Sequence, residues 1–151
     1  MARVGHTLIE CITVVLIVSV LALIAVPRLN LGAVRGAQTD AAVRRLATDL
    51  RRARMHAIAH AADNPTGFAL VMSSADPCGG YQIIDLHDSA VITSCNFPAD
   101  VRCSGGRRFE FGPLGNLKEG SDMQTRLYSN GTACELHIVP ATGMVRWLRD
   151  K

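Results

Sequence analysis

Apolar residues follow three successive patterns along the chain, and each pattern predicts a different kind of element. The first is a run from Leu8 to Val26, LIECITVVLIVSVLALIAV, in which Glu10 is the single charged residue. About 20 consecutive apolar residues form a helix that crosses a bilayer, so this run predicts a membrane-spanning helix. A secretory signal peptide has a shorter apolar core and then a small-residue cleavage site, whereas Pro27 and Arg28 follow here. We therefore expect the segment to be retained.

The second pattern predicts an amphipathic helix from Ala37 to Ala62, after a bend or local loosening at Pro27. Apolar side chains recur at steps of three and four and so share one stripe of the helix; they are Val43, Leu46, Leu50, Ala53 and Ala57. Asp63-Asn64-Pro65 ends the pattern. Most of the arginines lie off the stripe. They form either a flank that faces neighbouring subunits or an ordinary solvated helix face.

The third pattern consists of short β runs separated by turns, which predict a small antiparallel β-domain. The runs are Phe68–Met72, Tyr81–Leu86, Ala90–Ser94, Arg108–Phe111, Thr125–Tyr128, Glu135–Val139 and Met144–Leu148. Turns are expected at residues 113–116 and 140–143, and loops at 76–80 and 104–106. The predicted fold class is therefore α+β. A long N-terminal helix, with a membrane half and an amphipathic half, packs on the β-domain.

Four of the five cysteines, Cys78, Cys95, Cys103 and Cys134, lie outside the apolar run. No C-x-x-C spacing occurs among them, which favours two disulfides over a zinc site, and disulfides indicate an oxidising compartment such as the bacterial periplasm. Four free buried thiols are the alternative. Four cysteines allow three pairings. A hairpin of the second and third β runs would place Cys78 opposite Cys95, which favours Cys78–Cys95 with Cys103–Cys134.

Glu10 is the most informative single residue, because a carboxylate within a membrane segment is costly and usually functional. The apolar run contains no lysine or arginine that could neutralise it. The carboxylate therefore either reaches headgroup water near the helix end or pairs with a positive charge on another chain.

The N-terminal residues Gly5-His6-Thr7-Leu8-Ile9-Glu10, with the apolar helix and Pro27, resemble the leader of type IV pilins and type II secretion pseudopilins. The resemblance implies that prepilin peptidase cuts after Gly5 and that the new terminal residue, His6, is N-methylated. Glu10 would then pair with the N-terminal amine of a neighbouring subunit, and Pro27 would bend the helix. The family usually has Phe at the position of His6. The resulting organisation is a leader at 1–5, a transmembrane and filament-core helix at 6–27, an amphipathic helix at 28–64 and a periplasmic β-domain at 65–151.

Later segments look similar to the GspH/FimT minor pilins. They are the stretch from Asp49 to Ile58, the Arg108–Phe111 run with Gly115, and the closing stretch from Thr142 to Arg146. The resemblance implies a structural subunit that primes or caps a type IV pilus, with a type II secretion pseudopilin as the alternative. Its partners would be other pilins, prepilin peptidase and the bacterial inner membrane. The chain would cross that membrane once, keep its C-terminal domain in the periplasm, and later join the filament.

A second alternative is a pilus-borne subunit that binds DNA, because some members of the family are implicated in DNA uptake. The candidate residues are Arg107, Arg108, Arg146, Arg149 and Lys151. Scattered solvated charge is the plainer interpretation of these residues. No nucleophile elbow, P-loop, dinucleotide fingerprint or metal cluster occurs, so we expect neither an enzyme nor a cofactor or metal. His56 and His60 have a metal-compatible i,i+4 spacing but no third ligand.

Overall fold

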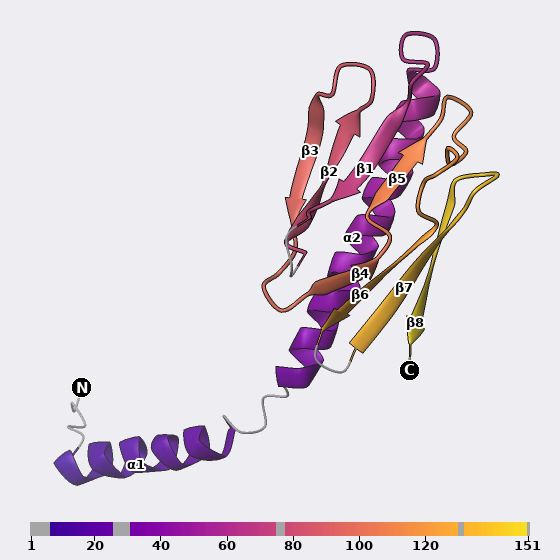
Figure 1. Cartoon of the computed structure of the whole chain (residues 1–151). Coiled ribbons are helices and arrows are strands. Elements are labelled where there is room, and N and C mark those ends of the chain that lie inside the picture. The colour runs from indigo at the N-terminus through magenta and orange to yellow at the C-terminus, as the bar shows by residue number, and fades with distance from the viewer. Residues whose placement is uncertain (1–6, 26–30, 75–77, 130–131, 151) are drawn as a thin grey trace. The chain divides into compact units, whose positions relative to one another are not determined.

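The computed structural model describes residues 7–25, 31–74, 78–129 and 132–150. It contains two helices and antiparallel sheets, which confirms the α+β class (Figure 1). The chain divides into two compact units, residues 1–33 and residues 34–151. The predicted cleavage residues Gly5 and His6, the predicted bend at Pro27, and Lys151 lie outside the described residues.

Helix α1, Leu8–Ala25, is the described element of the first unit. The carbonyl of Thr7 accepts hydrogen bonds from the backbone N–H groups of Glu10 (3.0 Å) and Cys11 (3.2 Å), which begins the helix. The prediction of a single-pass inner-membrane protein with a periplasmic domain is wrong, since no described helix is both long and apolar enough to span a bilayer.

Helix α2, Leu31–Ala59, contains the amphipathic stripe. All five predicted stripe residues are fully buried, which confirms the periodicity. The helix begins six residues before the predicted start at Ala37 and ends three residues before the predicted end at Ala62. The described helical structure is therefore two helices rather than the one long helix that the sequence predicted.

A turn in which Asn64 and Gly67 are buried follows α2 and leads into the first strand. The side chain of Asn64 accepts a hydrogen bond from the backbone N–H of Gly67 at 2.9 Å. Gly67 has φ of 79°, and a Cβ there would lie 2.0 Å from the carbonyl oxygen of Phe111. Only glycine fits this position, because an added side chain would meet both a strained backbone and a rigid neighbour.

Within the described residues, eight strands form two antiparallel sheets of four strands each. The first sheet has the order β3-β2-β1-β5, from strands β1 (Phe68–Met72), β2 (Gly80–Asp85), β3 (Val91–Asn96) and β5 (Arg108–Phe111). The second has the order β4-β6-β7-β8, from strands β4 (Arg102–Gly105), β6 (Gln124–Ser129), β7 (Thr132–Val139) and β8 (Met144–Asp150). All seven predicted strands are present. Strand β4 was missed, because its Cys-Ser-Gly sequence is typical of a loop.

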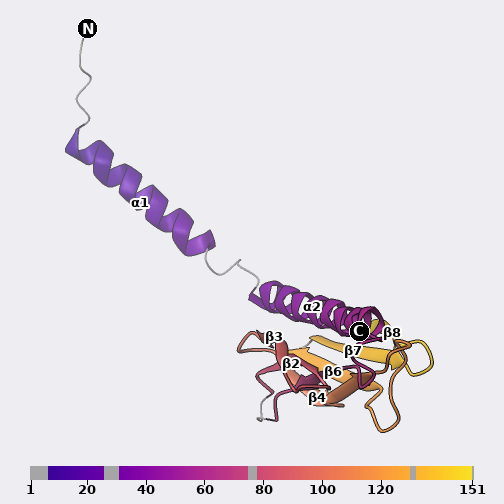
Figure 2. The same ribbon diagram turned by 90° about the horizontal axis from the view of Figure 1, so that it is seen from above.

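Helix α2 lies on one side of both sheets, and the main core lies between them (Figure 2). Its stripe packs with fully buried side chains of the first sheet, including Phe109 and Phe111, and of the second, including Leu127 and Leu136. Burying one such side chain stabilises the fold by about 1.5–3 kcal/mol. Helix α2 and both sheets therefore depend on one shared core.

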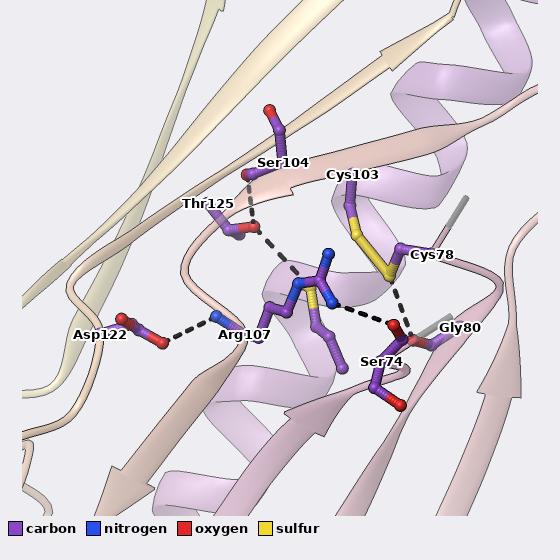
Figure 3. The surroundings of a disulfide bond; sticks show 9 residues. Ser74, Cys78, Gly80, Cys103, Ser104, Arg107, Asp122 and Thr125 are labelled. Carbon is purple, nitrogen blue, oxygen red and sulfur yellow. Dashed lines mark hydrogen bonds between the residues drawn. A yellow bond between two sulfur atoms is a disulfide. The ribbon is translucent and has the colours of Figure 1, made fainter. Parts of the chain in front are cut away.

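The predicted cysteine pairing is wrong. The one disulfide among the described residues joins Cys78 to Cys103, with 5.6 Å between their Cα atoms (Figure 3). Cys95 and Cys134 are free and buried. Cys78 lies just before β2 and Cys103 lies in β4, so the bond links the two sheets. Beside it, the Arg107 guanidinium donates to the carbonyl of Ser74 at 3.2 Å.

The register of the strands explains why the expected pairs do not form. The β2–β3 hairpin exists as predicted, but Cys95 pairs with Tyr81 and not with Cys78, which lies about 10 Å further along. Cys103 and Cys134 flank the same residue of β6, Leu127, from opposite sides. Two strand spacings place their Cα atoms about 10 Å apart, which is too far for a disulfide.

Three aromatic rings cover the end of α2. The rings of His56 and His60 are stacked with centroids 6.0 Å apart, and both lie against Phe68 at 5.5 Å and 5.9 Å. Burial, the nearby Arg52 cation and His60 lower the pKa of His56 below its ordinary value. Protonation of His56 is therefore less favourable in the folded protein than in the unfolded chain.

The observed pairing predicts the result of disulfide mapping. Non-reducing proteolysis and mass spectrometry of the denatured, alkylated protein should recover Cys78 linked to Cys103, with Cys95 and Cys134 alkylated. Cys103→Ser should lower the free energy of unfolding by about 2–4 kcal/mol, since it removes a cross-link that closes a loop. Ser104→Ala, on the same strand, should change it little. Recovery of a Cys78–Cys95 peptide would contradict the structure.

The lowered pKa of His56 predicts a loss of stability in mild acid. The unfolded chain binds this proton more tightly, so the contribution of His56 is present above the unfolded pKa of about 6.5 and is lost as the pH falls below it. The thermal midpoint of His56→Gln should therefore fall less than that of the wild type between about pH 7.5 and about pH 5. His87→Gln is the control; equal slopes in wild type and His56→Gln would refute the assignment.

Candidate assembly and binding sites

The most exposed apolar surface of the described chain is helix α1. Its large apolar side chains are 51–79% exposed and point in all directions around the helix. A helix that is apolar on every side is normally buried by surrounding elements, and large exposed apolar patches mark interaction sites. Helix α1 therefore has the surface of a helix that other elements normally cover.

Glu10 lies in the first turn of α1 and is the only acidic residue of that turn. A carboxylate at this position is stabilised by the positive end of the helix macrodipole. The remaining polar side chains of the helix are satisfied internally: the hydroxyls of Thr13 and Ser19 both donate to carbonyls one turn earlier, at 2.7 Å. Glu10 is the one charged side chain among the described residues of α1. The predicted partner amine, at His6 of a neighbouring subunit, lies outside the described residues.

Three arginines of α2 contact their own chain, which removes them from the predicted subunit-facing flank. The guanidinium of Arg44 lies 5.6 Å from the ring centroid of Trp147. Arg51 donates to the carbonyl of Val145 at 3.4 Å, and Arg54 donates to the carbonyl of Gly115 at 3.0 Å. These contacts fasten the helix to β8 and to the turn after β5. The sequence pattern gave no sign of them, because the three partners are more than 60 residues away.

The residues predicted to bind DNA are divided between the two sheets. Arg107 and Arg108 lie at the start of β5, where the Asp122 carboxylate accepts both of their backbone N–H groups, at 2.7 Å and 2.9 Å. The side chain of Arg108 also forms an ion pair with Glu110 at 2.5 Å.

Arg146 and Arg149 belong to β8, in the other sheet. Arg149 pairs with Asp40 of α2 at 3.4 Å, and Arg146 lies opposite His137 of β7. Asp40 also accepts a hydrogen bond from the free thiol of Cys134 at 3.7 Å. Burial, followed by the Asp40 charge, raises the pKa of that thiol. Among the described candidates, two of four arginines are therefore neutralised by acidic side chains.

A groove between α2 and the end of β3 was not predicted. It has a volume of about 430 Å³, and its lining comes from Gln38, Ala41, Ala42, Arg45, Tyr81, Cys95, Asn96, Phe97 and Pro98. Its lining segments are about 50 residues apart in the chain, so no sequence pattern could have found it. Beneath it, the Tyr81 hydroxyl donates to Asp49 at 2.5 Å. Burial, together with hydrogen bonds to Asp49 and Cys95, raises the pKa of Tyr81.

The described residues include no group of three or more His, Cys, Asp or Glu side chains arranged to hold a metal ion. His56 and His60 stack on each other and on Phe68 and are joined by no third ligand in that part of the chain. The candidate sites are therefore the surface of α1 with Glu10, and the groove beside β3.

Comparisons of the chain with protein-family models, with curated proteins and with solved structures give no match.

Proposed function

We propose that this protein is a minor pilin or pseudopilin, a subunit that joins a type IV pilus-like filament through α1. The observation that carries the proposal is the exposure of α1 on all sides, with Glu10 as the single charge in its first turn. Packing against the α1 helices of neighbouring subunits buries these side chains. Each large one contributes about 1.5–3 kcal/mol when it leaves water, so a helix bundle gains substantially from each subunit.

Glu10 gives this bundle its register. Burying this carboxylate inside a helix bundle costs free energy unless an opposite charge pairs with it. In the proposal, prepilin peptidase cuts after Gly5 and the methylated α-amine of His6 on the next subunit supplies that charge. The position of Glu10 in the first turn supports the pairing, because a chain end from a neighbour reaches the first turn without entering the centre of the bundle.

The second unit supports the finer, pilin-like description of the fold. Helix α2 packs on antiparallel sheets, and its buried stripe leaves Arg45 and Arg52 on the exposed side. Priming or capping a pilus and serving as a secretion pseudopilin require the same assembly through α1. The DNA-binding alternative stays a prediction, since the described arginines are split between the sheets and two of them are ion-paired.

Substitution of Glu10 tests the proposed pairing. In cells that make filaments, Glu10→Ala should reduce recovery of this protein in sheared filaments by about tenfold or more, because breaking a buried charge pair costs about 3–5 kcal/mol. Ser19→Ala is the matched control on the same helix and should assemble normally. Cellular levels of both variants are measured by immunoblotting. Normal assembly of Glu10→Ala, at cellular levels equal to those of the wild-type protein, would contradict the proposal.

The mature N-terminus gives an independent test. Intact-mass measurement of the protein from filaments should show a chain that begins at His6, with one added methyl group. Gly5→Val should retain residues 1–5 and stay out of the filaments, because it offers no free amine to Glu10. Ala2→Val, in the same leader, should be processed normally. Filaments that contain the uncut chain would exclude this mechanism.

A further inference from the structure

Among the described edge strands, β3 is the one that is neither covered, short nor charged. A β-bulge interrupts its pairing with β2 between Ile83 and Ile84, so its regular stretch is residues 93–96. At the other side of the first sheet, the 118–122 segment covers β5 through two hydrogen bonds, Lys118 N–H to Glu110 O and Asp122 N–H to Arg108 O, both 2.9 Å. In the second sheet, β4 has four residues and β8 carries two arginines. Short or charged edge strands resist further pairing. Strand β3 has six residues, Val-Ile-Thr-Ser-Cys-Asn, none of them charged.

The hydrogen bonds around β3 show which backbone groups face outward. Phe97 donates its N–H to the carbonyl of Gly79, and Asp85 donates to the carbonyl of Ala90, both at 2.9 Å. Residues of an antiparallel pair alternate between facing the partner strand and facing away from it. Thr93 and Cys95 therefore face β2, and the backbone N–H and C=O of Ser94 lie on the open edge. In the described part of the chain, these two Ser94 groups have no partner.

The groove beside α2 adjoins the end of this edge. Asn96, Phe97 and Pro98 continue directly from β3 into its wall. The opposite wall belongs to α2 and carries Arg45, which forms no ion pair with any described residue. Asp49, one helical turn away, accepts the Tyr81 hydroxyl. The groove therefore combines an apolar floor with the exposed Arg45 cation.

We propose that β3 is a docking edge for an extended segment of a partner protein. The segment adds to the first sheet as a fifth strand and makes backbone hydrogen bonds with the outward groups of β3. One of its apolar side chains fills the groove, and a neighbouring carboxylate meets Arg45. Strand addition obtains affinity from main-chain hydrogen bonds and specificity from side-chain pockets, and the edge and the groove supply both.

The exposed apolar side chains of β3 and the charge of Arg45 favour such a segment. Val91 and Ile92 are 53% and 41% exposed and offer apolar contacts along the edge. An uncharged edge accepts a segment without like-charge repulsion, and Arg45 favours an acidic one. Because the inference uses only residues of the second unit, it stands apart from the filament role of α1.

The test begins with a random library of twelve-residue peptides displayed on phage. The library is panned against the full-length protein in detergent micelles, which cover α1. Recovered peptides should share an apolar residue next to Asp or Glu, with no proline in the paired stretch, because proline lacks the N–H that strand pairing requires. Synthetic, fluorescein-labelled copies of these peptides are then the probes for anisotropy measurements.

Two paired variants locate the binding surface. Arg45→Glu should weaken binding by about tenfold or more, since it places a like charge against the peptide carboxylate. Arg52→Glu makes the same charge change two turns along α2, outside the groove, and should have little effect. Thermal melting of both variants checks that the fold is intact.

Backbone methylation of the probe identifies strand addition without altering the protein. In an added strand, only alternate N–H groups of the peptide point to β3. N-methylation of one alternating set should abolish binding, and methylation of the other set should leave it within about threefold. Equal effects of the two sets would overturn the proposal, as would failure to enrich any peptide or equal affinity for Arg45→Glu.

Rapid disulfide dimerisation of Ser94→Cys, with Gln82→Cys unreactive, would assign the edge to a second copy of this chain and would also overturn the proposal.

Discussion

The packing of one helical stripe across two separate sheets is the constraint on which the second unit depends. Neither sheet has a second layer of its own among the described elements, so the apolar faces of both are covered by α2. The stripe includes two alanines, Ala53 and Ala57, and Ala47 beside it is buried as well. Small side chains let the backbone approach closely, and the large Phe109 and Phe111 rings of the sheet then fill the space.

Because both sheets pack on one helix, other contacts are needed to hold the two sheets to each other. The Cys78–Cys103 disulfide closes one part, and nearby the hydroxyl of Thr125 in β6 donates to the sulfur of Met72 in β1 at 3.7 Å. Elsewhere, two turns touch: a Cβ on Gly143 would lie 2.1 Å from the carbonyl oxygen of Gly115. Arg54 of α2 donates to that same carbonyl. The helix, the turns and the disulfide thus hold together sheets that share no long strand pair.

Sequence periodicity predicted the parts of the fold that local physics decides. The stripe of α2 and the alternation of Arg108–Phe111 each place apolar residues on one face, and burial follows the pattern. The arrangement of the two sheets has no such local signal. Strand β4 has a loop-like sequence and is a strand only because it pairs with β6, so neither the sheet division nor the disulfide across it could be predicted. The contacts of the α2 arginines could not be predicted for the same reason. The residues that they contact, in β8 and in the turn after β5, become neighbours of α2 only after the sheets form.

The same distinction separates the two candidate sites. Glu10 within an apolar run is visible in the sequence, because one carboxylate among aliphatic side chains is anomalous wherever the helix packs. The sequence does not reveal that β3 is an edge strand, because an uncharged strand can have the same composition at the edge of a sheet as between two other strands. What marks β3 is the contrast with the other three edges, which are covered, short or charged. Of the four edges of the two sheets, three are covered, short or charged, and β3 is left open beside a groove that carries the exposed Arg45. Stability alone does not require this asymmetry. A docking segment accounts for both the bare edge and the cation beside it.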